Sequence, residues 1–348
     1  YSFQLSAHVA SVNLPPPAPT SPSNIVWESE TSVLISGTPT IPEGSCLTIE
    51  PGVKVMFAPG TQLRIQGKLS VQGTKDKKVL FVSESPSQRW GGIYINKEAK
   101  AHIEHAEISG ATFGIFASKS NAEISNTKIQ NSLVGIGFYG LSYEPPVVDS
   151  CRIENNAWGL VTLAGSKAII KNSSITGGQK GVLVDASSPE FYGNTISNNT
   201  QVGVVIYGMG YPRFGGIAIN QPGLNTIQNN GITQILAVKG YAFLGYGSGS
   251  YMLGGANIIT STDIYTPFTV ALDNSVISAM GTYWGTQQVN GTNFVLAGLS
   301  QMIYEPVMDP EEIEQLLMDA LQYRASGRYQ NSKLQCVNCR IFRRLIKN

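Results

Sequence analysis

The stretch IEHAEISGATFGI, residues 103–115, decides the fold, because the same layout returns four more times along the chain. The later copies are ISNTKIQNSLVGI from Ile124, VDSCRIENNAWGL from Val148, IKNSSITGGQKGV from Ile170 and FYGNTISNNTQVGV from Phe191. Their central isoleucines, Ile108, Ile129, Ile153, Ile175 and Ile196, are 21, 24, 22 and 21 residues apart. A unit this small cannot bury its own apolar side chains and needs neighbours, which is typical of a solenoid.

Each copy contains a short strand, a polar corner and a second short strand. If the central isoleucine points inward, the residue before it points outward, because side chains alternate along a strand. Stacking of the copies then predicts an outward ladder of Glu107, Lys128, Arg152, Ser174 and Thr195. The corner positions two residues after each isoleucine hold residues that tolerate left-handed backbone: Gly110, Asn131, Asn155, Gly177 and Asn198. An asparagine ladder is expected there. A glycine follows in every copy, at Gly114, Gly135, Gly159, Gly181 and Gly203.

The composition argues against charged partners. Only 14% of the 348 residues are charged, and the net charge is +1. A chain with so few charges and so little net charge lacks the excess of basic residues that favours binding to nucleic acid or to an anionic membrane. It contains no apolar run near the ~18 residues of a membrane span. Because it begins at Tyr1, we expect a removed signal peptide or a trimmed start.

Changes in residue composition and patterning divide the chain into three parts. Residues 1–24 form a proline-rich extended arm, and residues 25–305 form the solenoid of roughly ten coils, with a loop inserted after Gly203. Residues 306–348 are expected to form a small helical hairpin, since Asp309 suits an N-cap and Pro310 the first helical position. The hairpin resembles one tetratricopeptide repeat. It either caps the solenoid or begins a longer helical region.

Residues 48–74, TIEPGVKVMFAPGTQLRIQGKLSVQGT, and the RWGGI motif at 89–93 carry a resemblance to a known family. Over roughly residues 30 to 300 the chain resembles secreted bacterial right-handed parallel β-helix proteins of the pectate-lyase-like superfamily. The resemblance implies an all-β, right-handed parallel β-helix and a place outside a bacterial cell or on its surface. It leaves activity open, since that superfamily includes lyases, glycosidases, adhesins and proteins without chemistry.

Metal and cofactor sites are not expected. His102 and His105 lie close to Glu104 and Glu107, but the two histidines fall on opposite faces of a strand. The Cys336 and Cys339 pair stands in the expected helix without a second pair.

Catalysis is an alternative with weak candidates. Lyases of this fold need carboxylates holding calcium beside a basic residue, and glycosidases need two carboxylates. The candidates are Asp149, Glu154, Lys171 and Asp185, with Arg152, Lys180 and Glu190 near them in sequence. No three acids recur at one register, so calcium enters only under the lyase alternative.

Aromatic residues gather in the later coils. The candidate ligand-binding residues are Trp158, Tyr192, Tyr207, Tyr211, Tyr241, Tyr246 and Tyr251. Flat rings stack on sugars and anchor interfaces, although these rings could equally pack inside wider coils. Phe113, Phe116 and Phe138 are expected in the core.

The sequence therefore favours a non-catalytic β-helix scaffold that binds a polysaccharide or a surface protein through a lateral face. A polysaccharide lyase or glycoside hydrolase is the first alternative. A structural subunit of an extracellular assembly is the second.

Overall fold

The computed structural model describes residues 9–10, 23–216, 222–248, 251–255, 257–263, 267–280, 282–284 and 293–303. The chain divides into two compact units, Tyr1–Ile169 and Ile170–Asn348, with the division inside strand β20 (Ile169–Lys171). Each unit is a parallel β-solenoid, and the chain makes about ten turns in total. The described part of the chain contains no helix suited in length and apolar character to crossing a membrane.

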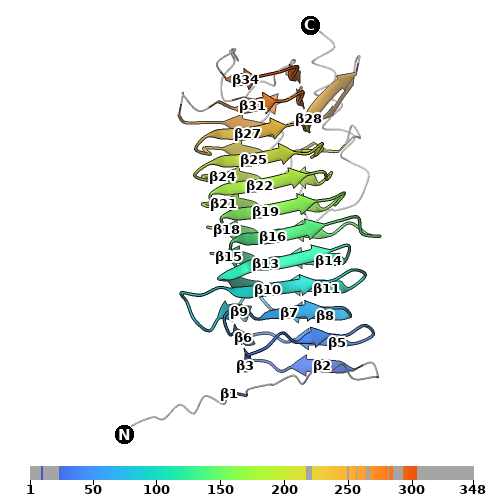
Figure 1. The fold of residues 1–348 in the computed structure, drawn as a ribbon, viewed down its shortest axis with the longest axis vertical. Coiled ribbons are helices and arrows are strands. Elements are labelled where there is room, and N and C mark those ends of the chain that lie inside the picture. Colours follow the sequence, from blue (N-terminus) through green and yellow to red (C-terminus); the bar gives the residue numbers. More distant parts are fainter. Residues whose placement is uncertain are drawn as a thin grey trace. The chain divides into compact units, whose positions relative to one another are not determined.

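In the first unit each turn contributes one strand to each of three sheets (Figure 1). Sheet A holds β1 (Val9–Ala10), β3 (Ser32–Ile35), β6 (Lys54–Phe57), β9 (Val79–Ser83), β12 (Ala106–Ser109), β15 (Lys128–Gln130) and β18 (Arg152–Glu154). Sheet B holds β2 (Asn24–Trp27), β5 (Cys46–Ile49), β8 (Lys68–Gln72), β11 (Lys100–Glu104), β14 (Asn121–Ser125) and β17 (Val147–Asp149). Sheet C holds β4 (Thr40–Ile41), β7 (Gln62–Ile65), β10 (Trp90–Ile95), β13 (Ala111–Ser118), β16 (Val134–Tyr139) and β19 (Trp158–Leu163).

The second unit repeats this plan. Its sheet A holds β21 (Ser174–Thr176), β24 (Thr195–Ser197), β26 (Thr226–Gln228), β30 (Asn257–Thr260) and β33 (Thr282–Tyr283). Its sheet C holds β22 (Lys180–Asp185), β25 (Val202–Tyr207), β27 (Thr233–Val238), β31 (Thr269–Leu272) and β34 (Phe294–Leu296). On its B side lie β23 (Glu190–Tyr192), β28 (Tyr241–Ser248), β29 (Tyr251–Gly254), β32 (Val276–Ala279) and β35 (Gln301–Ile303). β29 pairs antiparallel with β28.

The predicted inward isoleucines are confirmed. Ile108, Ile129, Ile153, Ile175 and Ile196 are all buried. The outward ladder is also confirmed within each unit, since Lys128 pairs in register with Glu107 and Arg152, and Ser174 with Thr195. This position of the repeat thus contributes a buried isoleucine in every copy.

The sequence predicted two strands per copy, and this prediction was wrong, because each turn contains three strands. The third strand lies on sheet C. In β16 its sequence is VGIGFY, which lacks the alternation of polar and apolar residues by which a strand is predicted. The recurring glycine lies in this strand. A Cβ on Gly135 would stand 2.5 Å from the Gly159 carbonyl oxygen and 2.8 Å from the Ile153 side chain. Glycine is therefore required for close stacking of successive turns.

The corner glycines and asparagines have the expected left-handed backbone, with φ between 55° and 71° at Gly110, Asn131, Asn155, Gly177 and Asn198. The side-chain ladder, however, lies one residue later and inside the solenoid. In the second unit the backbone N–H of Asn199 donates to Asn230 Oδ1 at 3.1 Å, and the Asn199 side-chain Nδ2 donates to the same oxygen at 2.9 Å. A further buried ladder, Asn194, Asn225 and Asn257, lines the corner between sheets B and A.

Two of the three phenylalanines expected in the core are not there. Phe138 is buried, whereas Phe113 and Phe116 point outward from sheet C and are half-buried. Their rings contact each other and Tyr94, with centroids 5.1 to 6.1 Å apart. Gly137 on the next strand leaves room for them, since a Cβ there would meet both rings.

The helical hairpin of residues 306–348, with Cys336 and Cys339, lies outside the described residues. In the proline-rich arm the described pair Val9–Ala10 forms β1, which runs parallel to β3.

Cys151 provides a test of the solenoid interior. Burial raises the pKa of its thiol to about 12, and its Sγ lies 3.5 Å from the Ile124 carbonyl oxygen. Only the thiolate reacts with alkylating reagents. We therefore expect iodoacetamide at pH 8 to modify Cys151 in the native protein about a thousandfold more slowly than in urea. Peptide mass spectrometry measures both rates, and equal rates would place this thiol outside a packed interior.

Candidate ligand-binding face

A short segment that is not a regular strand completes the B side of the second unit. Residues 211–214 lie between β23 and β28, because Arg213 forms parallel bridges to Glu190 and to Phe243. Backbone hydrogen bonds continue on both sides, from Arg213 N–H to the Pro189 oxygen and from Phe243 N–H to the Pro212 oxygen. The segment is held inside by Phe214, which stacks on Phe191 with ring centroids 4.8 Å apart.

Alternation along this segment sends Tyr211 and Arg213 outward, while Pro212 and Phe214 are buried. Tyr241 follows Tyr211 on the neighbouring strand β28. The two tyrosine rings are tilted by 52° with centroids 6.4 Å apart, and they are 41% and 42% exposed. Two half-exposed rings therefore stand side by side on the surface.

A polar cluster lies next to these rings. The Arg213 guanidinium pairs with one carboxylate oxygen of Glu190, and the Tyr192 hydroxyl donates to the other at 2.5 Å. Burial raises the pKa of Tyr192, so its hydroxyl keeps the proton that it donates. Arg213 Nε is buried with no hydrogen-bond partner. Glu190, Tyr192, Tyr211, Arg213 and Tyr241 form one outward surface, here called the tyrosine–arginine face.

Two further candidates meet at the adjoining corner of the second unit. Asp185 ends β22 and pairs in register with Tyr207, which ends β25 and is 50% exposed. Gly208 follows with a φ of 57°, and a Cβ there would collide with the Asp185 carboxylate. The chain then turns through Met209 and Gly210 into Tyr211.

The sequence candidates are therefore only partly brought together. Tyr192, Tyr211 and Tyr241 share one surface, and Tyr207 and Asp185 share the adjoining corner. Tyr246 and Tyr251 lie in the backbone pairing of β28 with β29, but their side chains are outside what the structure describes. Trp158 points outward from sheet C of the first unit.

The four catalytic candidates do not all lie on one sheet. In the first unit Asp149 lies on sheet B, whereas Glu154 lies on sheet A and pairs with Lys128 and Arg152. In the second unit Lys171 lies in β20 and Asp185 at the end of sheet C. Sequence reasoning overlooked Arg213, whose only signal was the alternation in YPRF, residues 211–214, within the insertion that follows Gly203.

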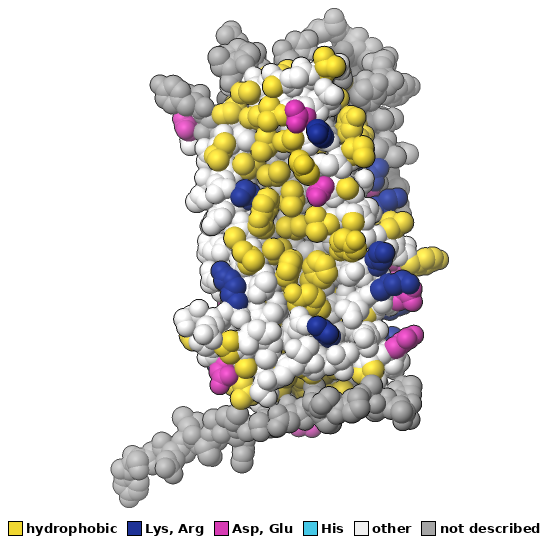
Figure 2. Space-filling model, viewed as in Figure 1, with side chains coloured by type: hydrophobic (Ala, Val, Ile, Leu, Met, Phe, Trp, Pro, Cys, Tyr) yellow, Lys and Arg dark blue, Asp and Glu magenta, His cyan; other side chains and the backbone are white. Residues whose placement is uncertain are grey.

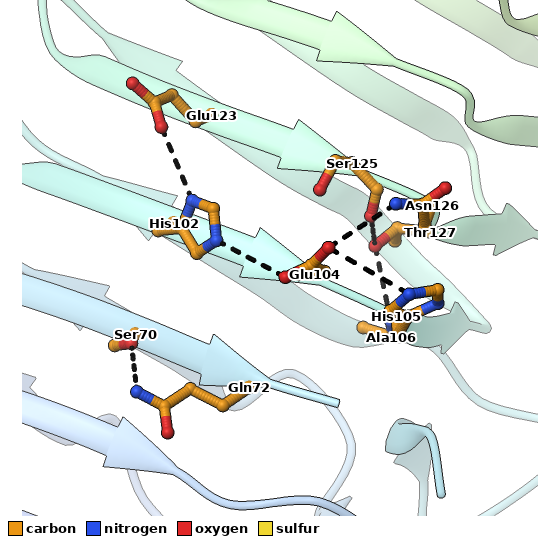
Figure 3. A network of polar contacts seen from close by, with 10 residues as sticks. All are labelled: Ser70, Gln72, His102, Glu104, His105, Ala106, Glu123, Ser125, Asn126 and Thr127. Carbon is orange, nitrogen blue, oxygen red and sulfur yellow. Dashed lines mark hydrogen bonds and ion pairs between the residues drawn. The ribbon is translucent and has the colours of Figure 1, made fainter. Parts of the chain in front are cut away.

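A second polar cluster lies on sheet B of the first unit (Figure 3). His102 stands between two carboxylates, with Nδ1 3.4 Å from Glu123 and Nε2 3.7 Å from Glu104. His105 also approaches Glu104, at 3.9 Å, from the corner where its φ is 48°. His102 and Glu123 are largely exposed, so water screens the interaction between their charges.

Neither cluster is arranged as a metal centre. Among the described residues, no three or more His, Cys, Asp or Glu side chains are grouped to hold a metal ion. In the first cluster Glu190 is already engaged by Arg213 and Tyr192, and in the second His102 lies between Glu104 and Glu123. The tyrosine–arginine face can offer stacking surfaces and a fixed hydrogen-bonding edge, whereas the His102 cluster can move a proton.

Comparisons with known proteins agree with the fold. The family described as "Right handed beta helix region" matches residues 87–243, and the "Pectate-lyase like beta helix domain" matches residues 19–132. No curated protein gives a significant match. Among solved structures, the chain is similar to the periplasmic alginate epimerase AlgG at 14% identity and a TM-score of 0.54, covering 84% of this chain and 80% of that one.

A point mutant of that epimerase gives the same TM-score and identity over 83% of this chain and 79% of that one. The mannuronan C-5 epimerase A-module of Azotobacter vinelandii matches at 14% identity with a TM-score of 0.36, over 82% and 91% of the two chains. At 14% identity, the similarity to the alginate epimerase shows the fold alone. The two family matches agree with the parallel β-solenoid turns that the described residues form.

Proposed function

We propose that the protein binds a polysaccharide through the tyrosine–arginine face of its second unit. The observation that carries the proposal is the pair of exposed rings, Tyr211 and Tyr241, beside a prearranged Arg213–Glu190–Tyr192 cluster. Sugar rings present apolar C–H faces and polar edges. A surface that joins aromatic faces to fixed hydrogen-bonding groups suits both.

Binding here needs little reordering. Tyrosine has two side-chain torsions, so few rotamers are lost when a sugar stacks on it. Glu190 is held on both carboxylate oxygens, and Arg213 is held by Glu190. Such preorganisation lowers the entropic cost of association. The protein would therefore act as a non-catalytic scaffold at this face.

The fold is compatible with this role. The alginate epimerase that shares it acts, by its name, on a polysaccharide. The proposal includes export to the periplasm or the extracellular space, as the resemblance of the sequence to secreted β-helix proteins implies. Affinity electrophoresis through gels containing neutral or uronic polysaccharides tests it, with retardation expected for the native protein and lost in a Tyr211→Ala/Tyr241→Ala variant.

A second candidate function is acid–base chemistry on a polysaccharide at His102. The specific observation in its favour is an exposed imidazole with carboxylates on both ring nitrogens. An imidazole is the side chain best suited to proton transfer near neutral pH. Under the scaffold proposal this cluster only stabilises the surface of sheet B.

We expect the protein to release no new unsaturated or reducing ends from a panel of soluble polysaccharides. Absorbance at 232 nm and a reducing-sugar assay measure the two products. Products that disappear in His102→Ala but persist in His105→Ala would instead assign catalysis to His102. His105 is the matched control because it contacts the same Glu104 from the corner.

A further inference from the structure

Sheet C of the second unit carries an unbroken outward row of aliphatic side chains. One comes from each of five adjacent strands, in register: Leu183, Val205, Leu236, Val270 and Val295. All five remain partly or largely exposed, and none is charged. Figure 2 shows hydrophobic side chains gathered over the strands of this sheet. We call these five residues the aliphatic row.

The row is flanked by a second apolar line. Tyr207, Val238 and Leu272 stand in register two residues further along the same strands, and the charged Asp185 ends this line on β22. Contiguous apolar surface of this kind marks a place where another element binds. A polysaccharide does not suit it, because the row offers no hydrogen-bonding side chain to sugar hydroxyls.

The dimensions favour a helix over a second copy of the chain. Five strands span about 19 Å, and six residues of strand span about 20 Å, so the face measures on the order of 400 Å². A stable protein–protein interface needs about 800 Å² from each partner. A single helix about 10 Å wide fits within such a face.

The chain itself contains a segment that the sequence predicts to form such a helix. Residues 304–348, outside the described part, follow directly on β35 of the same unit. From Asp309 the sequence predicts a helix start, and apolar residues then recur at helical spacing: Ile313, Leu316, Leu317, Ala320 and Leu321. A helix over 309–323 is about 22 Å long, close to the span of the aliphatic row.

We propose that residues 309–323 dock as an amphipathic helix along the aliphatic row. Leucine side chains of the stripe would lie between side chains of neighbouring strands. The five residues 304–308 reach at most about 17 Å when extended, which suffices to cross the short strands of sheet A between β35 and sheet C. The helix would lie against the side of the solenoid rather than cap its end.

A photo-crosslink in the full chain tests the proposal. Leu236 is replaced by p-benzoyl-phenylalanine, the protein is irradiated, and crosslinked peptides are identified by mass spectrometry. We expect crosslinks to residues 309–323 of the same chain. The control places the same group at Gln228, which points outward from sheet A, and should give none to that segment. Crosslinks between two chains, or none to 309–323, would overturn the proposal.

A second measurement does not depend on that substitution. Leu316→Glu/Leu317→Glu places charge on the apolar stripe and should release the helix, raising the binding of a hydrophobic dye several-fold. Gln315→Glu/Gln322→Glu adds the same charge on the opposite helical face and should leave dye binding unchanged. Strong dye binding by the native protein, with no increase in the leucine variant, would mean that nothing covers the row.

Discussion

Replacement of both exposed tyrosines, Tyr211→Ala/Tyr241→Ala, is expected to weaken polysaccharide binding at least tenfold. Each ring offers a stacking surface, and loss of a stacked aromatic costs about 1 kcal/mol beyond the area it buries. Two rings together therefore correspond to more than the 1.4 kcal/mol of a tenfold change in Kd. Isothermal titration calorimetry against the polysaccharide that retards the native protein measures the change.

The matched control removes two exposed tyrosines elsewhere. Tyr139 is 42% exposed and Tyr143 is fully exposed, and both belong to the first unit. Tyr139→Ala/Tyr143→Ala removes comparable aromatic surface without touching the tyrosine–arginine face. Equal losses in the two double variants would show that aromatic surface in general attracts the ligand, and the proposed site would be wrong.

The sequence was a good guide to the solenoid because one position of the repeat is dictated by burial. Ile129 and Ile153 are surrounded by polar residues of short strands, so their inward direction follows from alternation alone. The third strand escaped notice because both of its faces are apolar. In β16 even the outward positions hold Val134 and Gly137, so period-two alternation disappears.

The candidate site was harder to predict, since its residues come together only across turns. Tyr211 and Tyr241 are 30 residues apart in sequence. They become neighbours because part of the inserted loop, residues 211–214, lies beside β28. Arg213 became relevant only because the 211–214 segment replaces a strand beside β23. The sequence left open whether the tyrosines lie on the surface or inside the coils, and the structure exposes Tyr207, Tyr211 and Tyr241. The pairing of Glu190 with Arg213 depends on the register of the 211–214 segment.

The largest expected loss of stability follows from Asn225→Ala. Asn225 Nδ2 donates to the Phe191 oxygen at 3.0 Å and to Asn257 Oδ1 at 2.9 Å, and Asn225 Oδ1 accepts from the backbone and side chain of Asn194 at 3.0 Å each. The residue is fully buried. Alanine would leave several buried donors and acceptors without a hydrogen-bond partner, and each such group costs about 1 to 3 kcal/mol of stability.

We therefore expect Asn225→Ala to lower the free energy of unfolding by about 4 kcal/mol and the melting temperature by roughly 10 °C. Asn198→Gly is the matched control in the same unit, because Asn198 is exposed and its φ of 55° suits glycine. Its effect should stay within about 0.5 kcal/mol. Since Asn194 and Asn257 take part in the same ladder, their alanine variants should not add to the loss from Asn225→Ala. Additive losses, measured by urea denaturation, would mean that each asparagine acts alone and that the ladder does not couple successive turns.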